Sequence, residues 1–164
     1  MKTIIRNATI VNEGRRFIGS VVIEDETIQQ VLEGDDSTQI YDTEIDATGL
    51  YLFPGVIDDH VHFREPGLTH KADIASESRT AAAGGVTSFM DMPNTNPPTT
   101  TIELLEEKFR IAEKNSRINY SFFFGASNEN TDALVKHIKN QNNDYGIIIV
   151  SEGIYTLGVA AGTF

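Results

Sequence analysis

The segment FPGVIDDHVHFREPG, residues 53–67, joins a short apolar run to two histidines and a turn. The β-branched pair Val56-Ile57 lies between Pro-Gly and Glu-Pro-Gly turn signals, a pattern typical of a strand buried on both faces of a parallel sheet. Successive side chains of a strand alternate between its faces, so His60 and His62 would point the same way and could bind one metal ion. The segment therefore predicts a sheet strand that ends in a metal site.

A pair of histidines separated by one residue has a second explanation. In a chain with four histidines, such a pair can also arise by chance and be solvated at the surface. The position of His60 and His62 favours the metal site, because barrel enzymes carry their chemistry at the C-terminal ends of buried parallel strands. The remaining histidines, His70 and His137, have no partner at ligand spacing and are predicted to be solvated.

The sequence after this segment repeats a strand–helix pattern, with strands that begin about every 30 residues, as in successive βα units. Four strands fall short of an eight-stranded barrel, which usually needs about 250 residues. The expected fold class is therefore α/β, a partial (β/α)8 TIM-type barrel of about four βα units. Its expected elements are the helix His70–Ala83 closed by Gly84-Gly85, the strand Val86–Met90, the helix Thr101–Asn115 with a capping box of Thr100 and Glu103, the strand Tyr120–Phe124, the helix Asn130–Lys139 and the strand Gly146–Val150.

Residues 1–52 have a different pattern. Three short runs of β-forming residues, Thr3–Val11, Phe17–Glu24 and Thr27–Leu32, are separated by turn-forming residues. They predict a small antiparallel β-module. The expected domains are thus a β-module over residues 1–52 and a partial barrel over residues 53–164.

Composition excludes several classes of function. The net charge of −11 disfavours nucleic acid and anionic membranes as partners, because phosphate binding needs clustered Lys and Arg. No apolar run approaches the roughly 18 residues of a membrane span, and the first residues turn polar too early for a signal peptide, so we expect a cytoplasmic protein. The chain has no cysteine, so any metal must be held by histidine and oxygen ligands.

A second segment, DMPNTNPPT at residues 91–99, is long and specific, like the histidine segment. Together, the two segments resemble those of dihydroorotase, a cyclic amidohydrolase of pyrimidine biosynthesis, and the resemblance extends to about residue 140. It implies zinc-dependent, reversible hydrolysis of the cyclic amide of dihydroorotate to N-carbamoyl-aspartate. In that family two zinc ions activate a water for attack on the ring amide and polarise its carbonyl.

The resemblance also implies roles for individual residues. His60 and His62 would hold one zinc ion. Arg64 would bind the substrate carboxylate, because a guanidinium can donate two hydrogen bonds to a planar anion. Asn94 would support the same carboxylate or the substrate ring. Each has a simpler explanation. Arg64 could form a surface ion pair with Glu65, and Asn94 could merely form a turn. Asp58 is expected to orient a histidine rather than to bind metal.

Residues 145–164 depart from the family pattern. Where the family has a lysine that is carbamylated to bridge two metals, this chain has Ile148. No catalytic acid–base residue is identifiable, so the expectation is an inactive N-terminal fragment with an incomplete zinc site and a small-molecule substrate. The alternatives are an allantoinase- or hydantoinase-like enzyme, whose substrates lack the ring carboxylate, and a non-catalytic truncated remnant. Open strand edges also leave a homo-oligomer as an alternative.

Overall fold

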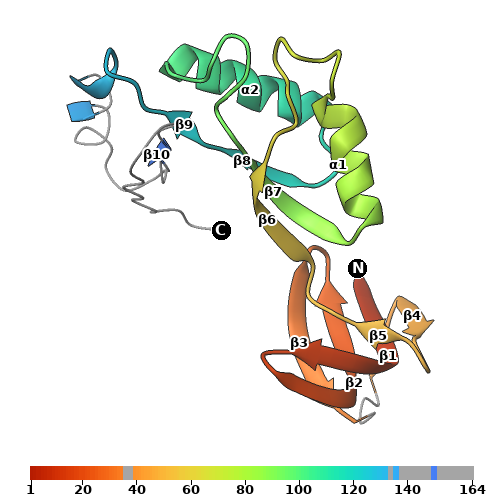
Figure 1. The fold of residues 1–164 in the computed structure, drawn as a ribbon. Coiled ribbons are helices and arrows are strands. Elements are labelled where there is room, and N and C mark those ends of the chain that lie inside the picture. The colour runs from red at the N-terminus through yellow and green to blue at the C-terminus, as the bar shows by residue number, and fades with distance from the viewer. Residues whose placement is uncertain (35–38, 133–134, 137–148, 151–164) are drawn as a thin grey trace. The chain divides into compact units, whose positions relative to one another are not determined.

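The computed structural model describes residues 1–34, 39–132, 135–136 and 149–150. The chain divides into two compact units, Met1–Pro54 and Gly55–Phe164 (Figure 1).

The N-terminal unit is a five-stranded sheet of mixed direction. Strands β1 (Lys2–Asn12), β2 (Arg15–Glu24) and β3 (Thr27–Glu33) pair antiparallel in sequence order, whereas β4 (Thr43–Asp46) and β5 (Tyr51–Leu52) both pair parallel to β1. The expectation of a purely antiparallel module is therefore wrong for its last two strands. The reason is where the chain returns after β3: it comes back to the free edge of β1, where Thr3–Arg6 of β1 pair with β4 and Thr9–Ile10 pair with β5.

This sheet buries apolar side chains on both of its faces. Neighbouring residues Val21 and Val22 belong to different clusters, as the alternation of side chains along a strand requires. One cluster consists of Ala8, Ile10, Val21 and Ala47, and the other of Ile4, Val22 and Tyr41.

The C-terminal unit contains a parallel sheet in the order β6-β7-β8 (Figure 1). Its strands are linked by two helices and followed by a short parallel pair, which confirms the α/β class. The elements are β6 (Val56–Val61), α1 (Ile74–Ala83), β7 (Val86–Asp91), α2 (Ile102–Asn115), β8 (Asn119–Phe122), and the pair β9 (Phe124–Gly125) with β10 (Ile149–Val150). Half of the residues of the expected helix Asn130–Lys139 and residues 146–148 of the expected last strand lie outside the described residues.

Both helices pack on one face of this sheet. The core between them is built from Ile74 of α1, Phe89 of β7, Ala112 of α2 and Phe122 of β8. Met90, the residue after Phe89, instead joins a cluster with Met92 and Phe123. Because side chains alternate along β7, that second cluster lies on the face away from the helices.

The ends of the helices correct two details of the sequence analysis. Helix α1 begins at Ile74 rather than at His70, because Asp73 is its N-cap and accepts a hydrogen bond from the Ser76 N–H; His70 is exposed in the preceding turn. Its expected end is confirmed, since Gly84 is the C-cap and Gly85 has a φ of 86°.

Helix α2 has Thr101 as its N-cap, so the expected capping box with Thr100 is wrong. The Thr100 hydroxyl donates instead to the Pro98 carbonyl. Within the described part of the chain, no helix has the length and apolar character needed to cross a membrane.

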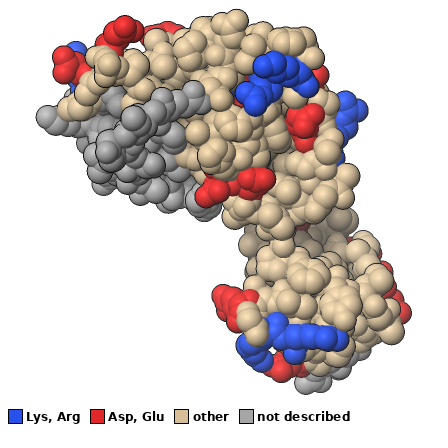
Figure 2. All heavy atoms as spheres, viewed as in Figure 1, with Lys and Arg blue, Asp and Glu red and all other residues tan. Residues whose placement is uncertain are grey.

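Charged side chains on the surface shown in Figure 2 are interspersed. Basic groups form small separate clusters beside acidic ones, and ion pairs such as Arg15–Glu33 and Arg6–Glu44, each with an N···O distance of 3.0 Å, join residues of neighbouring strands. A nucleic-acid-binding face carries a continuous basic stripe, which this face does not show among the described residues.

Candidate metal and substrate site

The two histidines lie at the C-terminal end of β6 and share a face. Val61 and Phe63 pack into the core beneath the helices, so His60 and His62, which alternate with them, project to the opposite face. The centres of the two imidazole rings are 5.4 Å apart, and the ring planes are inclined at 58°. His60 is exposed and His62 is half-buried.

This separation suits two ligands of one metal ion. A zinc ion about 2.0–2.1 Å from an imidazole nitrogen lies about 3.2 Å from the ring centre, so two imidazoles on a tetrahedral ion have centres about 5 Å apart. The observed 5.4 Å is close to that value. The pair is therefore compatible with metal binding without a large movement of β6.

Asn94, from the loop after β7, contacts the second histidine directly. Its Oδ1 lies 2.8 Å from the Nδ1 of His62. An amide oxygen can only accept, so the contact requires an imidazole proton on Nδ1, and in the neutral ring Nε2 then has a free lone pair. Metal-binding histidines have this arrangement, in which one ring nitrogen donates to an oxygen and the other binds the metal. In this structure Asn94 thus contacts a histidine, a role that the sequence analysis did not assign to it.

Backbone hydrogen bonds and a close packing contact join the loops that follow β6 and β7. The backbone N–H of Met92 donates to the Val61 carbonyl at 3.0 Å, and that of Asn96 donates to the Pro66 carbonyl at 3.2 Å. Gly67 has a φ of 80° and lies so close to the Asn96 carbonyl that a Cβ atom there would overlap it. These contacts bring the histidines, Asn94 and the backbone of Arg64 to one edge of the sheet, as parallel neighbouring strands should.

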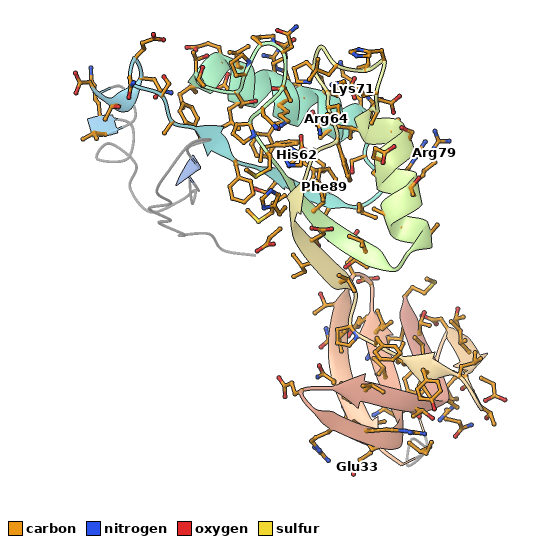
Figure 3. The ribbon with its side chains drawn as sticks, in the orientation of Figure 1. Glu33, His62, Arg64, Lys71, Arg79 and Phe89 are labelled. Carbon is orange, nitrogen blue, oxygen red and sulfur yellow. The ribbon has the colours of Figure 1, made fainter. Side chains whose placement is uncertain are left out.

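Arg64 is in an uncommon backbone conformation, with a φ of 68°. Within the described part of the chain, its guanidinium makes no hydrogen bond and no ion pair. The suggested ion pair with Glu65 is absent, because Glu65 Oε2 accepts from the Ile74 N–H at the start of α1, at 2.9 Å. Figure 3 places Arg64 and His62 near the ends of β6 and β7, whereas Arg79 projects from α1.

Asp58 contacts the backbone rather than an imidazole ring. Its Oδ1 accepts from the N–H of His60 at 3.2 Å. The carboxylate therefore contacts the backbone of the strand that carries the histidines, and its expected role in orienting a histidine stays a prediction.

Two buried charges beneath the site were missed by the sequence analysis. Asp91 and Lys108 are both 0% exposed, and their Oδ2 and Nζ atoms are 2.6 Å apart. Burial lowers the pKa of the Lys108 ammonium from its ordinary value, and the Asp91 carboxylate partly offsets this shift. A signal was present, because Lys108 lies on the otherwise apolar face of α2, between Leu105 and Ala112.

The donor set supplies half of a tetrahedral zinc shell. Among the described residues, no group of three or more histidine, cysteine, aspartate or glutamate side chains could hold a metal. The two imidazoles fit zinc as a ligand pair. Ile148, at the expected position of the bridging lysine, lies outside the described residues.

Residues 51–150 match the amidohydrolase family. The chain belongs to this family. The matched range contains the histidine segment, the DMPNTNPPT segment and both helices. The membership covers more than half of the chain and includes every candidate site residue.

Proteins similar to this chain carry different enzyme names. The dihydroorotase of Lactobacillus acidophilus is 38% identical over 135 residues, or 82% of this chain and 31% of that protein. The allantoinase of Deinococcus radiodurans is 46% identical over 91 residues, or 55% of this chain and 20% of that protein. The L-hydantoinase of Arthrobacter aurescens has a similar structure, with a TM-score of 0.78 and 25% identity, over 90% of this chain and 32% of that one. This amidohydrolase chain therefore spans about a third or less of the length of these relatives.

Proposed function

We propose that this chain forms the part of a dihydroorotase that binds one zinc ion and the substrate carboxylate. The reaction is the reversible hydrolysis of dihydroorotate to N-carbamoyl-aspartate, a cytoplasmic step of pyrimidine biosynthesis. One observation carries the proposal: the His60 and His62 rings are paired, and Asn94 holds His62 with one ring nitrogen free. The similarity to dihydroorotases over 82% of the chain supports it.

The chain's own residues have distinct tasks in this reaction. His60 and His62 would hold the zinc ion, and the Asn94 oxygen fixes the proton of His62 on Nδ1. When bound, zinc activates water for attack on an amide carbonyl and polarises that carbonyl. The Asp58 carboxylate accepts from the backbone at His60, and this contact supports the strand end that carries both imidazoles.

Arg64 would recognise the carboxylate of the substrate. Its donors are uncommitted within the described residues, and a guanidinium can donate two parallel hydrogen bonds to a planar carboxylate. A left-handed conformation costs a residue such as arginine about 1–3 kcal/mol. Arg64 has this costly conformation at the edge of the site, which supports a functional role for its side chain.

An allantoinase- or hydantoinase-like activity is the second candidate, favoured by the 46% identity to an allantoinase and by the structural similarity to a hydantoinase. Allantoin and hydantoin have no ring carboxylate for Arg64 to bind. The two proposals therefore differ in one measurable property: whether binding depends on a carboxylate of the ligand and on Arg64.

Calorimetric titration of the zinc-loaded chain with dihydroorotate, carbamoyl aspartate, allantoin and hydantoin tests this. We expect binding of the two carboxylate ligands, and a loss of about ten-fold or more in the Arg64→Lys variant with zinc content unchanged. Arg79→Lys is the matched control, because Arg79 lies on α1 and donates to the Ala75 carbonyl. Equal binding of hydantoin, or an equal loss in both variants, would contradict the proposal.

A second assay addresses catalysis. The zinc-loaded chain should show no measurable conversion between dihydroorotate and carbamoyl aspartate, because two imidazoles leave most of the metal shell to water and chelators. Zinc-dependent turnover that disappears in His60→Ala would show that this chain is catalytic. Failure of every ligand to bind would favour the non-catalytic remnant.

A further inference from the structure

We propose that the buried Lys108–Asp91 ion pair is a positioning device, which holds the histidine-bearing end of β6 in register with the Asn94 loop. Both side chains are fully buried, and their charged atoms are 2.6 Å apart. The inference deepens the proposed function, because it rests on His62 being a metal ligand. Neither residue contacts the site itself, so both act through other groups.

The pair connects the C-terminal ends of all three strands of the sheet. Asp91 Oδ1 accepts from the Phe63 N–H at 2.8 Å, directly after His62. The Lys108 ammonium donates to the Met92 carbonyl at 2.8 Å and lies over the Phe122 ring at 4.9 Å. One lysine from α2 therefore fixes the ends of β7 and β8, and through Asp91 it also fixes the chain that leaves β6.

The same links determine the geometry of the site. His62 is the residue before Phe63, and Asn94 is the second residue after Met92. A change in the position of Phe63 relative to Met92 therefore changes the 2.8 Å contact between the His62 ring and Asn94. In this way the ion pair sets which ring nitrogen of His62 is free.

Stability alone does not explain such a pair. Removing two charges from water offsets most of their attraction, so a buried ion pair can often be replaced by apolar residues without loss of stability. Here the carboxylate and the ammonium each make a further directional bond to backbone, at Phe63 and at Met92 respectively. These directional bonds specify position, which an apolar replacement cannot do.

Four variants of the 164-residue chain test the inference: Lys108→Met, Asp91→Asn, the double variant Asp91→Asn/Lys108→Met, and Ala112→Gly. The last is the matched control, because Ala112 is fully buried on α2 one turn beyond Lys108 and its loss weakens the helix without touching a charge. Each variant is measured for unfolding by urea, for zinc affinity by competition with a chromogenic chelator, and for the His62 ring tautomer by nitrogen-15 NMR without metal.

The single variants should weaken zinc binding by about ten-fold or more, and the His62 ring should lose its single Nδ1–H tautomer. The control should unfold at lower urea with zinc affinity and tautomer unchanged. The double variant should regain stability, because no unpaired buried charge remains, but should regain neither affinity nor tautomer.

Recovery of all three properties in the double variant would overturn the inference and leave the pair a structural role only. Unchanged affinity and tautomer in Lys108→Met would overturn it as well. The tautomer measurement separates the two proposals, since it needs no metal. If the wild-type chain binds no zinc but its His62 tautomer depends on Lys108, the proposed function fails, and with it the role in metal binding, whereas the effect of the ion pair on the position of the His62 ring is retained.

Discussion

Replacing Gly67 by alanine should destabilise the C-terminal unit by about 2–5 kcal/mol. Gly67 has a φ of 80°, and an alanine in the left-handed region costs about 1–2 kcal/mol. The new Cβ would also overlap the carbonyl oxygen of Asn96, which is backbone and cannot rotate away. Forcing such an overlap into packed structure typically costs about 1–3 kcal/mol more, because the two loops must separate.

Gly85→Ala is the matched control. Gly85 has a similar φ of 86°, but no atom lies within 4 Å of the position that its Cβ would occupy. Its substitution should therefore cost only the conformational part, about 1–2 kcal/mol. The difference between the two variants isolates the contact between the loops.

Urea unfolding followed by the helical circular dichroism signal measures both free energies, because α1 and α2 both belong to the C-terminal unit. Separation of the loops should also displace Asn94, so the His62 ring of Gly67→Ala should lose its single tautomer, whereas that of Gly85→Ala should keep it. Equal loss of stability in the two variants would refute the reasoning, since it would mean that the loops do not touch at Gly67.

Three further predictions concern single side chains. Arg64→Gly should raise the free energy of unfolding by up to about 1 kcal/mol, because glycine adopts the left-handed conformation without strain. Calorimetry of the same variant should show that binding of carboxylate ligands is lost. A lower free energy of unfolding would contradict this prediction. The hydrogen bond from the Ser76 N–H in the first turn of α1 lowers the pKa of Asp73. The stabilisation by the Asp73 carboxylate is therefore present at neutral pH and should disappear as the pH falls through that lowered pKa. Asp73→Asn should flatten the pH dependence of the free energy of unfolding in that range. Thr101→Ala should lower the free energy of unfolding by about 1 kcal/mol and Thr100→Ala by less, because Thr101 is the observed N-cap; the reverse order would restore the capping box expected from sequence.

Local pattern was enough to predict much of the C-terminal unit. The two-residue period of extended chain places His60, in β6, and His62, directly after β6, on one face. The Gly84-Gly85 pair ends α1 for an equally local reason, since glycine adopts the left-handed conformation that follows a helix. The parallel direction of β6, β7 and β8 follows from helices that connect consecutive strands.

Contacts between distant segments could not be predicted in this way. The mixed direction of the N-terminal sheet depends on where the chain returns after β3, and no turn signal encodes that return. The bond between His62 and Asn94 joins residues 32 positions apart, and the ion pair of Asp91 and Lys108 joins a strand end to a helix. Sequence shows a lysine on an apolar helix face, but not which carboxylate meets it.

The arrangement separates the groups that would meet ligand from the groups that hold them. His62 and Arg64 are on the loop after β6, and each is held by a neighbour: the ring of His62 by Asn94, and the backbone next to Arg64 by the bond from Phe63 to Asp91. Under the proposed function, altered recognition of a ligand carboxylate needs a change only at Arg64, whereas a change at Asp91 would disturb the backbone of both loops on this edge. On this argument, variation in substrate preference should map to the half-buried Arg64 and not to the fully buried pair of Asp91 and Lys108.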